Sequence, residues 1–128
     1  MDCPVLVDQR FTKEGNGWRL GWDATAPCYK GLLGGKAWAI ELTEAEFHTF
    51  RRLVLEISQT MGAIAAELME AERVTCEAEA DDLWLEAEGF PDAYSLRFVL
   101  AAGRRCEGEW DAVAAQHIVQ AIHYLALF

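Results

Sequence analysis

The sequence predicts an α+β protein in which four antiparallel strands followed by a long helix occur twice. Two observations carry this prediction. Hydrophobic and polar residues alternate through most of residues 74–110, which is the two-residue period of strands with one face in water. Hydrophobic residues spaced three and four apart follow both Thr43 and Asp111, which is the period of a helix with one buried face. We therefore expect one domain whose halves, 1–70 and 71–128, share a single pattern.

The first forty residues predict four strands, although their alternation is less regular. Glycine and proline residues between residues 15 and 35 mark the turns that separate them. Trp18 and Trp22 share one face of their strand, and we expect both of them and Trp38 to pack in the core. The strands are expected at residues 5–11, 18–23, 29–33 and 37–42.

The first long helix is expected to begin after Thr43. The Thr43 hydroxyl and the carboxylate of Glu46 form a capping box, in which each oxygen accepts a hydrogen bond from the other residue's backbone amide. The helix extends for about seven turns, or roughly 40 Å. Its hydrophobic face is widened by Leu53, Leu55 and Met69, so we expect it to pack broadly on a sheet. The stripe itself consists of Phe47, Phe50, Val54, Ile57, Met61, Ile64 and Leu68.

The second half predicts a meander that opens with a tight hairpin. Val74–Ala80 alternates hydrophobic and polar residues, and the alternation resumes at Leu83 with the opposite parity. A two-residue turn at Asp81-Asp82 pairs Ala78 with Leu85 and keeps both hydrophobic sets on one face.

Two more strands complete the meander. They are expected at residues 94–100, after a breaker at residues 89–92, and at residues 105–110, after a turn at residues 102–104. With hydrophobic residues on one face, cross-strand pairing sets Arg97 between two carboxylates. The outward row then reads Glu77, Glu86, Arg97 and Glu109. We interpret the acidic residues of this segment as the solvated face of a sheet rather than as a carboxylate site.

The second helix is expected to begin after its cap, Asp111, and to run to the end of the chain. Its buried stripe should contain Val113, Ile118, Ile122 and Leu125. The last turns are hydrophobic on nearly all sides, so they must be buried on more than one side or covered by another chain. That end is therefore a candidate for an oligomer contact. The residues concerned are Tyr124, Leu125, Leu127 and Phe128.

The composition is that of a soluble domain: 128 residues, 52% hydrophobic and 25% charged. The first residues lack the pattern of a signal peptide and no hydrophobic run could span a membrane, so we expect a cytoplasmic protein without membrane contact. The four cysteines lie far apart, which favours free thiols. The formal net charge of −10 disfavours partners that carry phosphate groups, because too few arginines cluster to offset it.

Patterns typical of catalysis and metal binding are absent from the sequence. His117 and His123 lie six residues apart on one helix and point in different directions, and His48 lies on the other helix, so no histidine pair can ligate one ion. Neither a nucleophile elbow nor a zinc-protease motif occurs, and residues 31–35 lack the Lys-Ser/Thr pair of a phosphate loop. We therefore expect no catalytic residue, no metal and no cofactor.

Four segments resemble a small family of uncharacterised cyanobacterial proteins: GWRLGWD (17–23), GLLGGKAWAIELTEAEF (31–47), EAEADDLWLEAEGFPDAYSLR (77–97) and GRRCEGEW (103–110). The resemblance covers nearly the whole chain and implies no catalytic residue. It implies the fold of single-stranded-DNA-binding transcriptional regulators of the Whirly type, built from two strand-strand-strand-strand-helix units. Whirly-type proteins bind single strands on an exposed sheet surface, which calls for cations and aromatic platforms. The corresponding surface here is acidic, which disfavours nucleic-acid binding.

We interpret the protein as a non-enzymatic interaction module that binds a protein partner, with homodimerisation as one form of such a contact. A regulator that binds single-stranded DNA or RNA is the alternative, and it rests on the expected fold. Trp84 points outward from its strand, where it can stack on a ligand, fill a partner's pocket or cover Val99. The arginines near it could hold an anion or could be solvated turn residues. The candidate interaction residues are Trp84, Arg97, Arg104, Arg105, Tyr124, Leu127 and Phe128.

Overall fold

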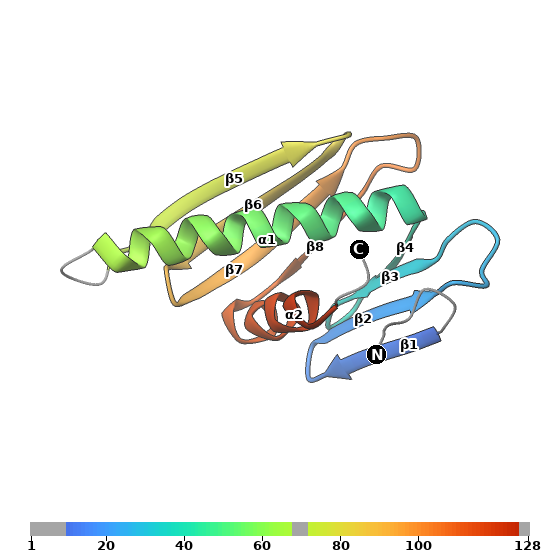
Figure 1. Cartoon of the computed structure of the whole chain (residues 1–128), viewed down its shortest axis with the longest axis horizontal. Coiled ribbons are helices and arrows are strands. Elements are labelled where there is room, and N and C mark those ends of the chain that lie inside the picture. The colour runs from blue at the N-terminus through green and yellow to red at the C-terminus, as the bar shows by residue number, and fades with distance from the viewer. Residues whose placement is uncertain (1–9, 68–71, 126–128) are drawn as a thin grey trace, which may run out of the picture.

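The computed structural model describes residues 10–67 and 72–125. It contains two antiparallel four-stranded sheets, each followed in the chain by a helix (Figure 1). Sheet A has the order β1-β2-β3-β4 and sheet B the order β5-β6-β7-β8, so every strand pairs with its neighbours in the chain. The predicted α+β fold, four strands and a helix twice, is confirmed.

The bounds of the elements follow the chain order. The first unit consists of β1 (Arg10–Gly15), β2 (Trp18–Asp23), β3 (Gly31–Gly34), β4 (Ala39–Leu42) and α1 (Glu44–Glu67). The second consists of β5 (Val74–Ala80), β6 (Leu83–Phe90), β7 (Ala93–Leu100), β8 (Cys106–Trp110) and α2 (Ala112–Tyr124).

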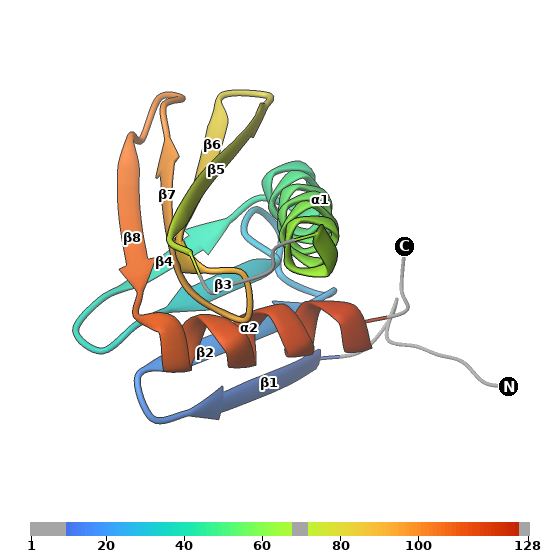
Figure 2. The same cartoon turned by 90° about the vertical axis from the view of Figure 1, so that its left-hand side faces the viewer.

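Both helices lie on the inner side of the two sheets, which meet at an angle (Figure 2). Although α1 follows sheet A in the chain, it packs mainly on β5 and β6 of sheet B. Similarly, α2 follows sheet B but contacts β2 of sheet A as well as β7. The outer face of each sheet is left without a covering helix (Figure 2).

The two sheets are joined by a buried aromatic cluster. The indole nitrogen of Trp110 donates a hydrogen bond to the carbonyl oxygen of Gly34 at 2.8 Å, and the Trp110 ring lies 5.2 Å from that of Trp38. Gly108 occupies the inward position between Cys106 and Trp110, where a β-carbon would lie 2.6 Å from the Trp38 ring. The missing side chain on β8 therefore leaves the space that Trp38 fills.

Both predicted helix starts are confirmed. The Thr43 amide donates to the Glu46 carboxylate at 2.9 Å, and the Glu46 amide donates to the Thr43 hydroxyl oxygen at 3.2 Å. Asp111 caps α2 by accepting a hydrogen bond from the Ala114 amide at 2.9 Å. These caps satisfy backbone amides that the first helical turn leaves without an internal partner.

The predicted register of sheet B is also confirmed. Ala78 pairs with Leu85 across the turn at Asp81-Asp82, and both turn residues have positive φ, as a two-residue turn of type I′ requires. Arg97 lies opposite Glu86 on one side and Glu109 on the other. The hydrophobic residues of the four strands consequently face the helices.

The predicted end of the first strand, at residue 11, was wrong. β1 spans Arg10–Gly15 and runs directly into β2, because Asn16-Gly17 forms a two-residue turn in which Gly17 has a φ of +82° and Gly15 pairs with Trp18. Most of the expected strand at residues 5–11 lies outside the described residues.

Other strand boundaries differ by a few residues. β3 begins two residues later than expected, since Lys30 closes the preceding loop by accepting from the Asp23 amide. β4 also begins two residues later, after a turn in which the Gly35 amide donates to the Trp38 carbonyl oxygen. β6 continues to Phe90, which pairs with Ala93, so residues 91–92 form the turn where a longer breaker was expected. β8 begins at Cys106 because Arg105 has a φ of +31°.

The second helix departs from its predicted pattern at both ends. Val113 was expected in the buried stripe but is 70% exposed. The helix ends at Tyr124 because Leu125 adopts an extended conformation, although the Leu125 side chain is buried as predicted. Four residues predicted to extend the two helices, Leu68, Met69, Leu127 and Phe128, lie outside the described part of the chain.

Candidate functional site

The outer face of sheet B carries most of the acidic side chains that the sequence placed there. We call this surface the acidic face. Arg97 is the only cationic side chain within the four strands, and no helix covers this side of the sheet (Figure 2). Its carboxylates belong to Glu77, Glu79, Glu86, Glu88, Glu107 and Glu109.

Trp84 lies on β6 at the end of the acidic face next to the Asp81-Asp82 turn, between Glu79 of β5 and Val99 of β7 in the register. Its indole nitrogen donates a hydrogen bond to the Glu77 carboxylate at 2.9 Å. The Arg97 guanidinium lies 4.9 Å from the ring centroid, within range of a cation–π contact. The half-buried ring is thus held on two sides, and its remaining surface faces outward.

The charge on this face is only partly balanced. Arg97 lies 3.9 Å from the Glu86 carboxylate and 3.6 Å from that of Glu107, although the register places it opposite Glu109. Arg73, just before β5, binds Glu88 at 2.7 Å. Six carboxylates against these two guanidinium groups leave four negative charges in excess. Exposed pairs of this kind contribute at most about 1 kcal/mol each, so the face adds little to stability.

The three candidate arginines have different surroundings. Arg97 lies on the acidic face, whereas Arg104 binds Glu46 at 2.6 Å and donates to the Glu41 carbonyl oxygen at 3.1 Å. Arg104 also lies 4.9 Å from the Tyr29 ring centroid. Arg105 is exposed in the loop before β8. Arg97 and Arg104 are each paired with different carboxylates, so the structure does not bring the three together around one anion.

The candidate at the end of α2 is strongly exposed. Tyr124 is 77% exposed, and the Lys13 ammonium lies 4.3 Å from its ring centroid. Nearby, the Trp18 ring stacks on His117 with a centroid separation of 5.4 Å. Sequence reasoning missed the roles of Lys13, Trp18 and His117, because their proximity arises only when the first hairpin packs beside the last helix.

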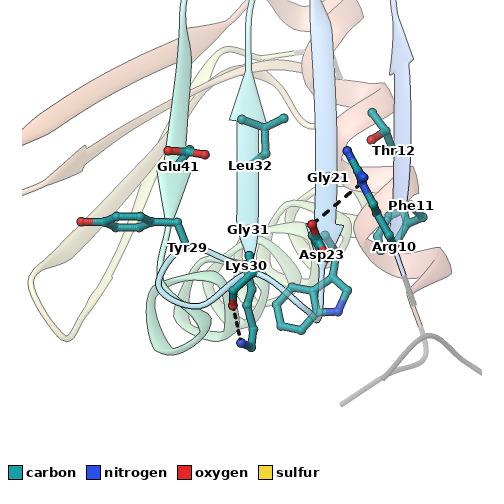
Figure 3. Close-up of a pocket in the computed structure, with 12 residues that line it drawn as sticks. Arg10, Phe11, Thr12, Gly21, Asp23, Tyr29, Lys30, Gly31, Leu32 and Glu41 are labelled. Carbon is teal, nitrogen blue, oxygen red and sulfur yellow. Dashed lines mark hydrogen bonds and ion pairs between the residues drawn. The ribbon is translucent and has the colours of Figure 1, made fainter. Parts of the chain in front are cut away.

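A shallow hollow of about 200 Å³ occurs on the outer face of sheet A (Figure 3). Gly21 forms its floor, between Thr12 and Leu32 in the register. At its rim, Arg10 lies 3.9 Å from the Asp23 carboxylate, as the dashed line in Figure 3 marks. A glycine inside a strand is the sequence signal that could have pointed to this hollow.

The charged side chains around the hollow form pairs of opposite charge. Hydrogen bonds from Thr25 lower the pKa of Asp23, so that its carboxylate stays ionised and balances Arg10. Arg19 on the same face lies 3.9 Å from Glu14. Because both arginines already have acidic neighbours, this face is not a cationic groove of the kind that single-stranded nucleic acids require.

Two of the described thiols, those of Cys76 and Cys106, are poorly suited to nucleophilic chemistry. Burial raises the pKa of both Cys76 and Cys106, which keeps these thiols protonated at neutral pH. Within residues 10–67 and 72–125, no three histidine, cysteine or acidic side chains are grouped as metal ligands. No helix in that part of the chain is long and apolar enough to cross a membrane.

Comparisons with known proteins indicate a family without an assigned activity. A family described as a domain of unknown function, DUF1818, matches residues 13–125. A solved structure from Prochlorococcus sp. NATL2A, described as a protein with unknown function from the DUF155 family, is similar, with a TM-score of 0.83 and 29% identity. The similarity covers 89% of this chain and 97% of that chain. No curated protein matches this chain.

Proposed function

Because the chain belongs to the family described as a domain of unknown function, DUF1818, we propose a function from its geometry. The protein is a non-enzymatic module, and its acidic face binds a lysine- or arginine-rich segment of a protein partner. The single observation that carries the proposal is Trp84, held in a defined orientation on a surface with excess negative charge.

The chemistry of this face matches a basic segment in two ways. Glu79 and Glu109 are exposed and form no ion pair with the described cationic residues, so they can pair with lysine or arginine from a partner. The outward surface of Trp84 offers a contact for the hydrocarbon stems and the charged ends of those side chains. The excess charge also accelerates the encounter with a cationic partner, particularly at low ionic strength.

The same features argue against catalysis as the primary role. The carboxylates of the acidic face lie on an open sheet surface, where water competes for every polar contact and a substrate would not be enclosed. Binding of a flexible basic segment needs no enclosure, since it relies on many weak contacts spread along a surface.

Binding of a labelled peptide tests the proposal. Fluorescence anisotropy would compare a lysine- and arginine-rich peptide, a matched peptide with glutamate at the basic positions, and a single-stranded oligothymidylate. We expect the basic peptide to bind and the acidic one not to. Affinity should fall as salt is added, because exposed charges are screened.

The variant Glu77→Gln/Glu79→Gln removes two charges from the face, while the new amide oxygen at position 77 can still accept from Trp84. At about 0.5–1 kcal/mol for each lost contact, we expect the affinity for the basic peptide to fall roughly five- to thirtyfold. The control Glu56→Gln/Glu67→Gln removes the same charge from exposed sites on α1. Equal losses in both variants would contradict a defined docking face, and tighter binding of the oligothymidylate would favour the nucleic-acid alternative.

A further inference from the structure

The helix α2 presents an exposed face without any charged side chain other than histidine. None of its thirteen residues is aspartate, glutamate, lysine or arginine, although charged residues make up 25% of the chain. An exposed helix face is normally rich in charge. Five of the six exposed side chains form what we call the α2 stripe: Val113, Gln116, His117, Gln120 and Tyr124. The sixth, His123, lies beside the stripe.

The stripe carries hydrophobic surface at both ends. Val113 and Tyr124 are 70% and 77% exposed, more than any other large hydrophobic residue in the described part of the chain. The thirteen residues of the helix rise about 20 Å, so these two side chains lie near opposite ends of a short rod. Surface of this kind is typical of a contact between proteins.

Two hollows lie beside the stripe, between α2 and the hairpin formed by β1 and β2, and we call them together the trough. One hollow of about 290 Å³ is lined by Lys13, Trp18 and Tyr124, among others. A second of about 360 Å³ is lined by Lys36, Asp111, Val113 and neighbours. His117, stacked on Trp18, lines both hollows, so they lie next to each other along α2.

The two ends of the stripe are complementary to each other, in hydrophobic residues and in charge. Val113 lies four residues before His117, and Tyr124 lies four residues after Gln120, so the stripe is symmetric about its middle. When two stripes align antiparallel, Val113 of one copy therefore lies beside Tyr124 of the other. The Lys13 ammonium lies at the Tyr124 end, whereas the Val113 end has Glu109 and Asp111 against one lysine, Lys36. The same alignment therefore brings opposite charges together at each end.

We propose that the α2 stripe binds the same stripe of a second copy of this chain, antiparallel and about a two-fold axis. This contact shares Glu109 with the acidic face but lies away from Glu77 and Glu79, and it goes beyond the proposed binding of a basic segment. A two-fold interface uses one patch twice, which requires the self-complementary arrangement just described. The trough lining also contains two lysines, Lys13 and Lys36, and two acidic residues, Glu109 and Asp111. Although each copy carries a formal net charge of −10, the charges of the two contacting surfaces therefore cancel.

Sedimentation velocity of the full chain over a concentration series tests the proposal. We expect a monomer–dimer equilibrium, and we expect Val113→Glu to weaken it at least tenfold, because each copy then loses the hydrophobic contact with Tyr124 and adds a third carboxylate beside Glu109 and Asp111. Ala66→Glu, at an exposed position on α1, is the matched control and should leave the equilibrium unchanged. Circular dichroism verifies that both variants fold.

A charge exchange tests the antiparallel arrangement without relying on Val113. Lys13→Glu should weaken the dimer, because the new carboxylate of one copy then meets Glu109 and Asp111 of the other at each end. Combining it with Glu109→Lys should restore the dimer. A monomer at every concentration, or a dimer that Val113→Glu leaves intact, would overturn the proposal. So would a monomeric chain whose binding to a single-stranded oligothymidylate is lost on Val113→Glu, since the trough would then be a nucleic-acid surface.

Discussion

At the scale of single residues, Glu46 shows how one carboxylate serves two parts of the fold. It accepts a hydrogen bond from the Thr43 amide at the start of α1, and the same carboxylate binds Arg104 from the loop between β7 and β8. Its side chain is 17% exposed. The capping role is local and was predicted from the sequence, whereas the contact with Arg104 depends on how the two halves pack.

The pKa of Glu46 makes this contact testable. Burial of the carboxyl group opposes its ionisation, but hydrogen bonds from Arg104 and Thr43 outweigh that effect and hold the pKa of Glu46 below its ordinary value of 4.5. The ionised group therefore stabilises the fold at neutral pH, and this contribution is lost as the pH falls through the lowered pKa. Glu46→Gln should reduce the free energy of unfolding at pH 7 by about 1–2 kcal/mol, measured by urea titration.

In acid, the difference between wild type and Glu46→Gln should shrink, because wild-type Glu46 also becomes neutral there. Glu44→Gln, in the same helical turn but facing His48, controls for the loss of an acidic residue near a helix start. A difference that stays constant from neutral to acidic pH would show that the charge of Glu46 is not the source of the effect.

At the scale of elements, the turn at Asp81-Asp82 sets the register of sheet B. Both residues lie in the left-handed region, with φ values of +51° and +68°, where side chains other than asparagine and aspartate are costly. Asp81 has a further role, because its carboxylate accepts a hydrogen bond from the buried Thr49 of α1 at 3.1 Å. Among the described residues, the Asp82 side chain has no such partner; its backbone carbonyl oxygen accepts from the Ala101 amide at 2.8 Å, a contact that does not depend on the side chain.

Asp82→Gly should therefore stabilise the protein. Glycine adopts the left-handed conformation without the steric cost of a side chain, so we expect a gain of roughly 0.5–1 kcal/mol in the free energy of unfolding and a higher melting temperature. Asp92→Gly is the control, since Asp92 lies in the turn between β6 and β7 without a positive φ. That variant should be neutral or destabilising. A stabilising Asp92→Gly together with a destabilising Asp82→Gly would contradict this account.

The elements also show where local pattern reasoning stops. The register of Arg97 and the orientation of Trp84 followed from alternation and one turn, because a strand's side chains must point to opposite faces. The exposure of Val113 did not follow, because its helical position fits the hydrophobic stripe and only the location of β2 and β7 determines which side of α2 is covered. The end of β1 was misplaced because Asn16-Gly17 forms the whole turn before β2, where a longer turn was expected.

At the scale of the whole molecule, each helix helps to cover the sheet of the other half. α1 packs on β5 and β6, α2 contacts β2, and Trp110 donates its hydrogen bond to Gly34 across the junction. The division into halves at 1–70 and 71–128 is thus one of chain order, and the hydrophobic faces of each half are completed by the other.

We accordingly expect neither half to fold alone. The fragments 1–70 and 71–128, produced separately, should lack the far-ultraviolet circular dichroism of the full chain, because each exposes the hydrophobic faces of its helix and sheet. Mixing them in equal amounts should recover part of the signal. The full chain, measured under the same conditions, is the reference. A single fragment with native-like helix content and a cooperative melting transition would contradict this expectation.

The sequence by itself determined the order of strands and helices, both helix caps and the register of sheet B. These features depend on backbone periodicity and on side chains a few residues apart. Only the tertiary structure decided that Arg104 binds Glu46, that Lys13 lies on Tyr124 and that the α2 stripe remains uncovered. Such contacts join residues far apart in the chain, and they depend on how two sheets and two helices share one core, which local periodicity does not specify.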